Sequence, residues 1–173
     1  MYNEVYINNK VRKEYKHLLA NIGNLSPDVI KRKKSEAEDI IRNIGITFSV
    51  YSNTDMTEHL IPFDMFPRII SASEWKKIHD GVTQRALAIN AFLRDIYHTG
   101  EIFRAGFVPS DLIYRNPAFD VKMIGFDVPH HVYAPIIGSD IVRTSKNDFY
   151  VLEDNCRIPS GVSYMIENRE IMM

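Results

Sequence analysis

Three oxygen-bearing side chains follow one another at the end of the apolar segment "FYVLEDN": Glu153, Asp154 and Asn155. Successive side chains of a β-strand point to opposite faces, so Glu153 and Asn155 share one face and Asp154 points to the other. Carboxylate and amide oxygens are the ligands that magnesium prefers in proteins. Glu153 and Asn155 are therefore candidate metal ligands.

A second acidic residue can join this face from the preceding segment, "GSDIVR". If Lys146 and Asn147 form a two-residue turn between two antiparallel strands, Asp140 lies directly opposite Glu153. Facing carboxylates repel each other unless a cation lies between them. Asp140, Glu153 and Asn155 then form a predicted metal site. A three-residue loop would break this register, and a polar hairpin end in solvent remains the alternative interpretation.

The segment "RIPSG" after the predicted strand adds groups suited to an anion. The guanidinium of Arg157 suits a phosphate or a carboxylate. The backbone amides of Ser160 and Gly161, which open the last predicted helix, are placed to hold an anion. An ordinary loop and helix cap explains the same residues equally well.

Two further features are attractive for chemistry but favour simpler interpretations. Cys156 stands beside the acidic residues, yet it has no evident histidine partner, and we expect it to pack as a small apolar side chain. His130 and His131 are neighbours on a predicted strand and would point apart, with no further ligands at zinc-like spacing. We expect them to be surface or core histidines.

Composition indicates an ordinary globular protein with one sizeable core. The chain has 173 residues, 45% of them hydrophobic, and a formal net charge of -1, which argues against a nucleic acid or an acidic membrane as partner. The single cysteine forms no internal disulfide. Without an apolar run of about 18 residues or a signal-peptide pattern, the expected location is the cytoplasm.

Hydrophobic periodicity predicts an α+β fold in which N-terminal helices precede a mixed or antiparallel sheet. The predicted domains are an N-terminal helical segment over 1–45 and an incomplete α+β domain over 46–173. Helices are expected over 9–23, 26–45, 73–98, within 109–117 and from 160 onward, and strands over 46–51, 57–63, 127–144 and 148–155. Ser26 is the predicted cap of the second helix, and Gly45 its stop.

The segment "FYVLEDNCRIPSGVSYMIENRE", together with "ITFSVY", "PFDMFPRII", "NAFLRDIYH" and "GSDIVR", resembles the circularly permuted ATP-grasp proteins related to glutathionylspermidine synthetase. The resemblance implies a partial ATP-grasp-like fold. Glu153 and Asn155 match the Glu-x-Asn pair that holds magnesium under the phosphates of ATP, and Asp140 matches the acidic partner on a neighbouring strand. Where glutathionylspermidine synthetase-like members carry an arginine, this chain has Gly138.

The resemblance also assigns roles to the loop that follows. Arg157 would take part in catalysis, and Ser160 and Gly161 would approach the substrate or the ATP phosphates. The implied reaction joins a carboxylate to an amine through an acyl phosphate, with magnesium and ATP required. The implied partners are ATP and a carboxylate and amine substrate pair, with no nucleic acid and no membrane.

In the permuted family, the nucleotide-gripping lysines follow the strand that carries Glu-x-Asn, whereas this sequence reaches Met173 soon after that strand. The expectation is therefore the N-terminal portion of a longer ligase, unable to complete catalysis alone. Such a chain would associate with itself or with a complementing C-terminal piece. The alternative is a non-catalytic remnant or association module with the same fold.

Overall fold

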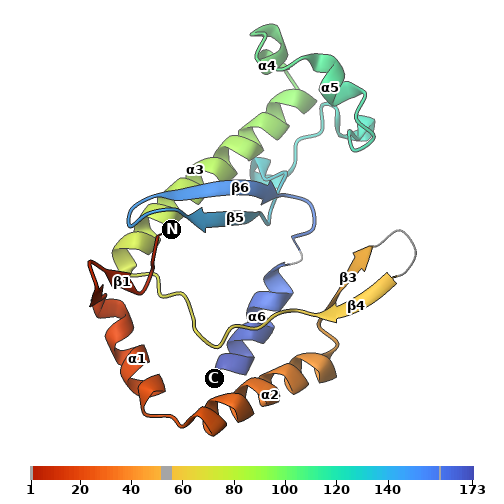
Figure 1. Cartoon of the computed structure of the whole chain (residues 1–173). Helices are drawn as coiled ribbons and strands as arrows, with labels where there is room; N and C mark the ends of the chain where they lie inside the picture. Colours follow the sequence, from red (N-terminus) through yellow and green to blue (C-terminus); the bar gives the residue numbers. More distant parts are fainter. Residues whose placement is uncertain (1, 52–55, 160) are drawn as a thin grey trace. The chain divides into compact units, whose positions relative to one another are not determined.

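The structure is a computed structural model that describes residues 2–51, 56–159 and 161–173 (Figure 1). It is an α+β fold, as the sequence predicts, with helices and three two-stranded sheets in the described part of the chain. Two compact units result: Met1–Ala72 with Arg143–Asp148 and Ser160–Met173, and Ser73–Val142 with Phe149–Pro159. The predicted domain boundary at residue 45 stays a prediction.

The first unit opens with a small hairpin of β1 (Tyr6–Ile7) and β2 (Lys10–Val11). Asn8 and Asn9 make its turn with positive φ angles of 50° and 60°, a conformation that asparagine tolerates better than most residues. Arg12 follows, with only 8% of its surface exposed, and its guanidinium lies 5.8 Å from the ring centroid of Tyr15. The Tyr15 hydroxyl accepts a hydrogen bond from the backbone N–H of Ile69, which ties two distant segments of this unit together.

The helix predicted over 9–23 is shorter in the structure. Lys10 and Val11 pair in β2, and Lys13–Tyr15 forms the 3-10 helix η1, so α1 covers only Lys16–Gly23. Backbone pairing with β1 therefore takes the N-terminal residues that periodicity alone assigns to a helix.

The second helix, α2 (Pro27–Ile44), has the predicted ends. Ser26 accepts a hydrogen bond from the Val29 N–H at 3.4 Å, Pro27 occupies the first turn, and Gly45 ends the helix with a left-handed φ of 76°. Ile41 is fully buried on its inner face.

The hairpin predicted after Gly45 is present. β3 (Thr47–Tyr51) and β4 (Met56–Leu60) are antiparallel, and Thr47 lies opposite Leu60. The predicted turn between them covers 52–55, which lies outside the described residues. The last helix, α6 (Gly161–Met172), follows the second unit in sequence and leaves Val162, Met165 and Ile166 exposed.

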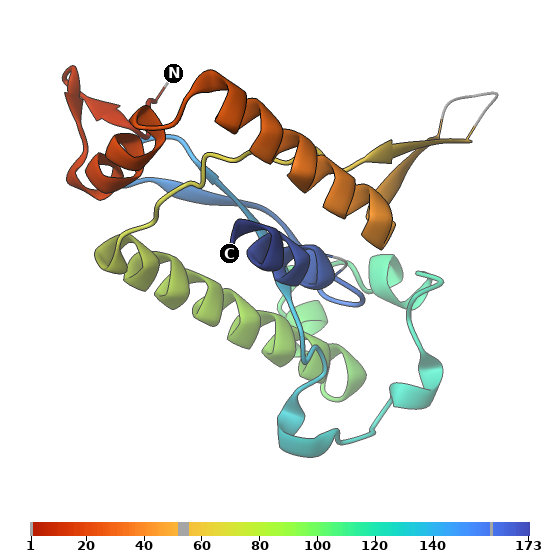
Figure 2. The same ribbon diagram turned by 90° about the horizontal axis from the view of Figure 1, so that it is seen from below.

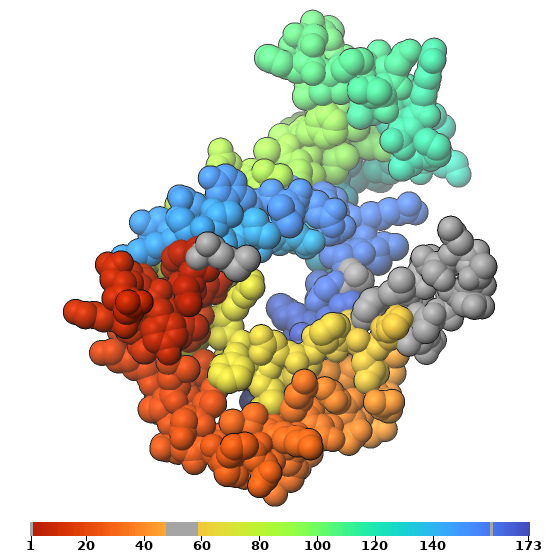
Figure 3. Space-filling view, viewed as in Figure 1, coloured from red at the N-terminus to blue at the C-terminus, as the bar shows by residue number. Residues whose placement is uncertain are grey.

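The second unit is built on α3 (Ala72–Tyr97), which continues without a break through Gly81 (Figure 2). Ile78 and Ile96 are its buried residues. Beyond its C-terminal end lie α4 (Glu101–Arg104), α5 (Ser110–Tyr114) and the 3-10 helix η2 (Val121–Met123), gathered in one lobe (Figure 3). Stacked rings hold this lobe to the helix end, since the ring centroids of Tyr97 and Phe119 are 4.9 Å apart.

The strand predicted over 127–144 is wrong for its first half. Within this range only Gly138–Arg143 forms a strand, β5, and Pro129–His131 forms the 3-10 helix η3 instead. Two features explain this difference. Prolines cannot donate to a sheet ladder, and the side chain of Asn90 on α3 takes the place of a partner strand by bonding both the N–H of Ala134 at 2.9 Å and its carbonyl at 3.4 Å.

His130 and His131 therefore do not sit on a strand, as the sequence interpretation assumed. Both are exposed, which agrees with the expected surface placement, and both have positive φ angles, 56° and 57°. Among the described residues, no helix has the length and apolar character that a membrane crossing needs.

Substitutions of two glycines, Gly45 at the end of α2 and Gly81 inside α3, should change the free energy of unfolding in opposite directions. Gly45→Ala should lower the free energy of unfolding by about 1 kcal/mol, because alanine at a left-handed φ meets its own carbonyl. Gly81→Ala, in the middle of α3 with open space around its Cα, should raise that free energy by about 0.5–1 kcal/mol. Urea unfolding followed by circular dichroism measures both, and equal shifts of the same sign would contradict the assigned conformations.

Candidate metal centre

The candidate ligands lie on the hairpin of β5 and β6 (Phe149–Asn155), the third two-stranded sheet of the described chain. The turn between the strands is closed by a hydrogen bond from the Thr144 N–H to the Asp148 carbonyl at 3.1 Å. Side chains support the turn as well, because the Ser145 hydroxyl donates to the Asp148 carboxylate at 2.6 Å.

Two contacts indicate how the strands are aligned. The Ser139 hydroxyl donates to Asp154 Oδ1 at 2.6 Å, so these two residues face each other. A Cβ placed on Gly138 would lie 3.8 Å from the Cβ of Asn155, which makes these two residues neighbours across the strands. Alternation along both strands then places Asp140 beside Glu153. This is the alignment that a two-residue turn predicts.

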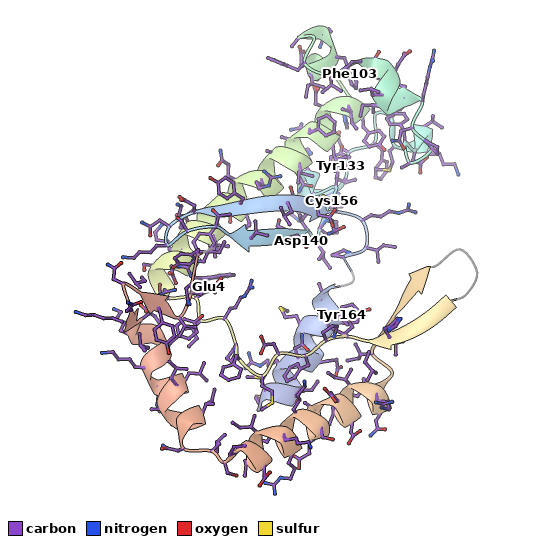
Figure 4. All side chains as sticks on the ribbon, viewed as in Figure 1. Glu4, Phe103, Tyr133, Asp140, Cys156 and Tyr164 are labelled. Atoms are coloured by element: carbon purple, nitrogen blue, oxygen red, sulfur yellow. The ribbon has the colours of Figure 1, made fainter. Side chains whose placement is uncertain are left out.

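The exposed face of the hairpin carries the three predicted ligands. Asn155 Nδ2 donates to Glu153 Oε1 at 3.0 Å, so these two side chains share a face. Asp140, labelled on β5 in Figure 4, is exposed like the other two. The hydrogen bond uses the amide nitrogen and one carboxylate oxygen, which leaves Oδ1 of Asn155 and Oε2 of Glu153 as oxygens that can bind a cation.

Asp154 points to the opposite face, as alternation predicts. Its carboxylate accepts hydrogen bonds from Nε of Arg85 on α3, at 2.9 Å, and from the hydroxyl of Ser139. Only 9% of its side chain is exposed, against 48% for Arg85. The hydrogen bonds from Arg85, and then those from Ser139, lower the pKa of Asp154 below its usual value.

Arg85 and Ser139 support the candidate site and were missed by sequence reasoning. A half-buried carboxylate on a strand signals that some basic partner exists. It does not indicate which one, because Arg85 is 69 residues away from Asp154 in the chain. Their role is positional, since they hold the strand that carries Glu153 and Asn155.

The loop after β6 lies against the start of β5. A Cβ on Gly138 would come within 2.9 Å of the Pro159 Cβ, closer than real side chains approach. The position where glutathionylspermidine synthetase-like members carry an arginine therefore has no room for a side chain with this loop in place.

The structure gives less support to the predicted anion-binding residues. Arg157 is exposed and forms no hydrogen bond or ion pair with the residues that the structure describes. Ser160 lies outside the described residues. Gly161 is the first residue of α6, exposed and with open space around its Cα, and it belongs to the other compact unit. The roles of these three residues stay predictions.

Cys156 has the properties of a packed thiol. It is half-buried at the end of β6, and its Sγ donates to the carbonyl of Asp154 at 3.5 Å (Figure 4). Burial, and then the charge of Asp154, raises the pKa of this thiol. A nucleophilic cysteine needs the opposite shift, so this environment supports the sequence interpretation.

The donor set suits magnesium better than a structural metal. Across residues 2–51, 56–159 and 161–173, no three histidine, cysteine, aspartate or glutamate side chains gather in a way that could hold a metal. Two carboxylates and one amide make a weak site by themselves. They suit an ion that takes its remaining ligands from water and phosphate oxygens, as magnesium does in nucleotide sites.

Comparisons with known proteins show the family of this chain. The sequence model of a family described as "A circularly permuted ATPgrasp" matches residues 67–173. An uncharacterized protein of Synechocystis sp. is 40% identical over 87% of this chain and 31% of its own length. An uncharacterized protein of Mycobacterium leprae is 40% identical over 94% of this chain and 28% of its own length.

A further relative has a name that states an activity. The "Putative glutamate--cysteine ligase 2-2" of Frankia casuarinae is 32% identical over 93% of this chain and 18% of its own length. The chain therefore spans less than a third of the length of these relatives.

Asp154→Asn tests the contact that positions β6. The pKa of Asp154 is lowered on folding, so its carboxylate stabilises the fold above the unfolded-state pKa of about 3.9 and loses this effect as the pH falls through the folded-state value. We expect the variant to lose about 1 kcal/mol of unfolding free energy at neutral pH. The difference from the wild type should shrink below about pH 4.

Asp111→Asn is the matched control, because Asp111 pairs with Arg115 on an exposed helix surface. Its effect should stay below about 0.5 kcal/mol. A pH-independent difference between Asp154→Asn and the wild type, measured by urea unfolding, would contradict the assigned ion pair.

Gly138→Ala tests the contact between β5 and the loop after β6. The added methyl group must displace Pro159, and overpacking of this kind costs about 1–3 kcal/mol. We expect a lower Tm in differential scanning calorimetry. Gly161→Ala, which meets no atom within 4 Å, should leave the Tm unchanged or raise it. Equal Tm values for both variants would show that Pro159 does not pack on Gly138.

Proposed function

Because this chain belongs to the circularly permuted ATP-grasp family, we propose that it forms part of an ATP-dependent carboxylate–amine ligase and supplies that enzyme's magnesium ligands. Asp140, Glu153 and Asn155 are the proposed ligands. The whole ligase would transfer the terminal phosphoryl group of ATP to a substrate carboxylate. An amine would then attack the acyl phosphate and release inorganic phosphate.

The observation that carries the proposal is the exposed face of the β5–β6 hairpin. Asp140 and Glu153 are neighbours across the two strands, and neither forms an ion pair with a basic side chain of the described chain. Like charges opposite each other on a sheet are destabilising. A bound cation removes this repulsion, and Asn155 adds a neutral oxygen on the same face.

The residues around the hairpin have distinct proposed roles. When bound, magnesium would neutralise charge on the ATP phosphates during phosphoryl transfer. Arg85 and Ser139 hold β6 through Asp154, so that Glu153 and Asn155 face outward. We propose that Arg157 contacts a phosphate or carboxylate oxygen, and that the backbone amides of Ser160 and Gly161 approach the phosphates.

The relative in Frankia casuarinae supports the choice of reaction class. Its printed name describes a ligase that joins glutamate to cysteine, a carboxylate and an amine. The identities of the two substrates of the present protein do not follow from this likeness, because the chain spans only 18% of that relative.

One observation favours a second candidate function, an association module without catalysis. Helix α6 exposes Val162, Met165 and Ile166, with 41%, 64% and 51% of their surfaces accessible. Exposed apolar side chains on one short helix suit contact with another protein surface or with a second copy. The two proposals differ in whether Asp140, Glu153 and Asn155 are needed for ATP turnover by the whole protein.

The test is a pair of neighbouring substitutions in the full-length ligase. Glu153→Gln should reduce ATP turnover by a hundredfold or more, because it weakens an electrostatic stabiliser of phosphoryl transfer, and Asn155→Ala should act in the same direction. Neither side chain packs in a core, so the unfolding temperature should change little.

Asp154→Asn is the internal comparison, since Asp154 faces α3 and should affect stability more than turnover. Turnover is measured well below the unfolding temperature of every variant. Undiminished turnover in Glu153→Gln would reject the metal assignment and favour the association module. Equal losses for Glu153→Gln and Asp154→Asn would indicate a general structural effect.

A further inference from the structure

A second hollow lies along α3, away from the hairpin ligands. It has a volume of about 580 Å³ and is formed by the C-terminal half of α3 and by η3 with the residue that follows it. Asp140, Glu153 and Asn155 do not line it. All of its lining residues belong to the same compact unit.

Basic side chains converge on this hollow from two segments. Arg94 comes from α3 and His98 from the turn that follows it, and His130 and His131 come from η3. The guanidinium of Arg94 forms no hydrogen bond or ion pair with the part of the chain that the structure describes, although the Arg94 backbone carbonyl lies 2.9 Å from Nδ1 of His98. Guanidinium and protonated imidazole groups donate charge-assisted hydrogen bonds to carboxylates.

The backbone of η3 shows that these histidines are held there at a conformational cost. His130 and His131 both adopt the left-handed region, with φ angles of 56° and 57°. Glycine occupies that region freely, whereas residues with a Cβ are strained in it. Strain of this kind gathers at binding and catalytic sites, where the side chain is needed.

The other polar groups at the hollow already have partners. The carboxylate of Asp95 accepts hydrogen bonds from the Thr99 hydroxyl and from the backbone N–H groups of Glu101 and Ile102. Asn90 bonds the backbone of Ala134. These residues therefore shape the hollow, and its open hydrogen-bonding groups are mainly the donors of Arg94 and the imidazoles.

One further acidic residue, Asp127, contacts two of the imidazoles. Asp127 Oδ1 is 3.3 Å from Nε2 of His98 and 3.8 Å from Nδ1 of His131. It does not line the hollow. Asp127 therefore contacts two of the rings and forms no ion pair with the Arg94 guanidinium.

Apolar side chains complete the lining. Leu87 has 68% of its surface exposed and Val132 has 45%, and both face the same hollow. Ligand sites commonly combine such apolar walls with a few convergent polar groups. A ligand that matches both has an anionic end and a hydrocarbon part.

We propose that this hollow binds a small organic acid. The guanidinium of Arg94 binds the carboxylate, and the imidazoles of His130 and His131 are further donors. Leu87 and Val132 cover the hydrocarbon part of the ligand. This site is separate from the proposed magnesium ligands, and it goes beyond the function proposed above.

Titrations of the 173-residue chain with sodium acetate, sodium butyrate and inorganic phosphate test the proposal, with the histidine ring signals followed by NMR. Butyrate should shift the His130 and His131 signals and bind about tenfold more tightly than acetate, because two more methylene groups become buried. Phosphate binding as tight as butyrate binding would overturn the assignment of an organic acid. Absence of any saturable shift with butyrate would overturn the site.

Matched variants test the individual residues. Arg94→Gln should weaken butyrate binding at least tenfold. Arg115→Gln should not change it, since Arg115 directly follows α5, has 82% of its side chain exposed and pairs with Asp111. Equal losses in the two variants, or no loss in Arg94→Gln, would contradict the proposal.

His130→Gly separates binding from folding. It should raise the Tm or leave it unchanged, because glycine relieves the left-handed strain, while it weakens butyrate binding. Unchanged butyrate affinity in this variant would remove His130 from the site. These variants leave Glu153 and Asn155 intact. A negative result for butyrate binding would therefore not argue against the magnesium proposal, and rejection of the magnesium proposal would not argue against the organic-acid site.

Discussion

The ion pair between Arg85 and Asp154 is the interaction on which the candidate metal centre depends. It joins the middle of α3 to the end of β6, and Ser139 adds a second hydrogen bond from β5. Because side chains alternate along a strand, a contact that fixes Asp154 on the inner face also fixes Glu153 and Asn155 on the outer one. The half-buried carboxylate of Asp154 thus orients two exposed candidate ligands that it does not touch.

The outer face of the β5–β6 hairpin differs from the inner face because its carboxylates have no basic partner among the described residues. The inner carboxylate has a guanidinium and a hydroxyl as partners, and its pKa is lowered accordingly. The outer carboxylates, Asp140 and Glu153, have each other as neighbours and an amide beside them. The same two strands therefore carry a neutralised acidic residue on one side and a pair of like charges on the other. That contrast separates a structural carboxylate from carboxylates suited to a cation.

Helix α3 holds other segments of its unit at two places along its length. Arg85 contacts β6, and a little more than one turn later Asn90 holds the backbone of Ala134 in place of a strand partner. This second contact keeps the segment before β5 irregular, and it leaves η3 beside the C-terminal half of the helix. The strained histidines and Arg94 then meet at one hollow. One helix can contact both regions because its side chains are spaced at a fixed rise along the helix axis.

Local patterns in the sequence determined much of this protein. Ser26, Pro27 and Gly45 define the limits of α2, and the strand period assigns Glu153 and Asn155 to one face. These features depend on neighbouring residues, so the sequence is sufficient for them. Arg85 as partner of Asp154, the contact of Gly138 with Pro159 and the irregular course of residues 129–137 were decided only by tertiary structure. Each of these features joins segments that are distant in the chain, or replaces the hydrogen bonds of a partner strand by those of a side chain. The local spacing of apolar and polar residues contains no information about such contacts.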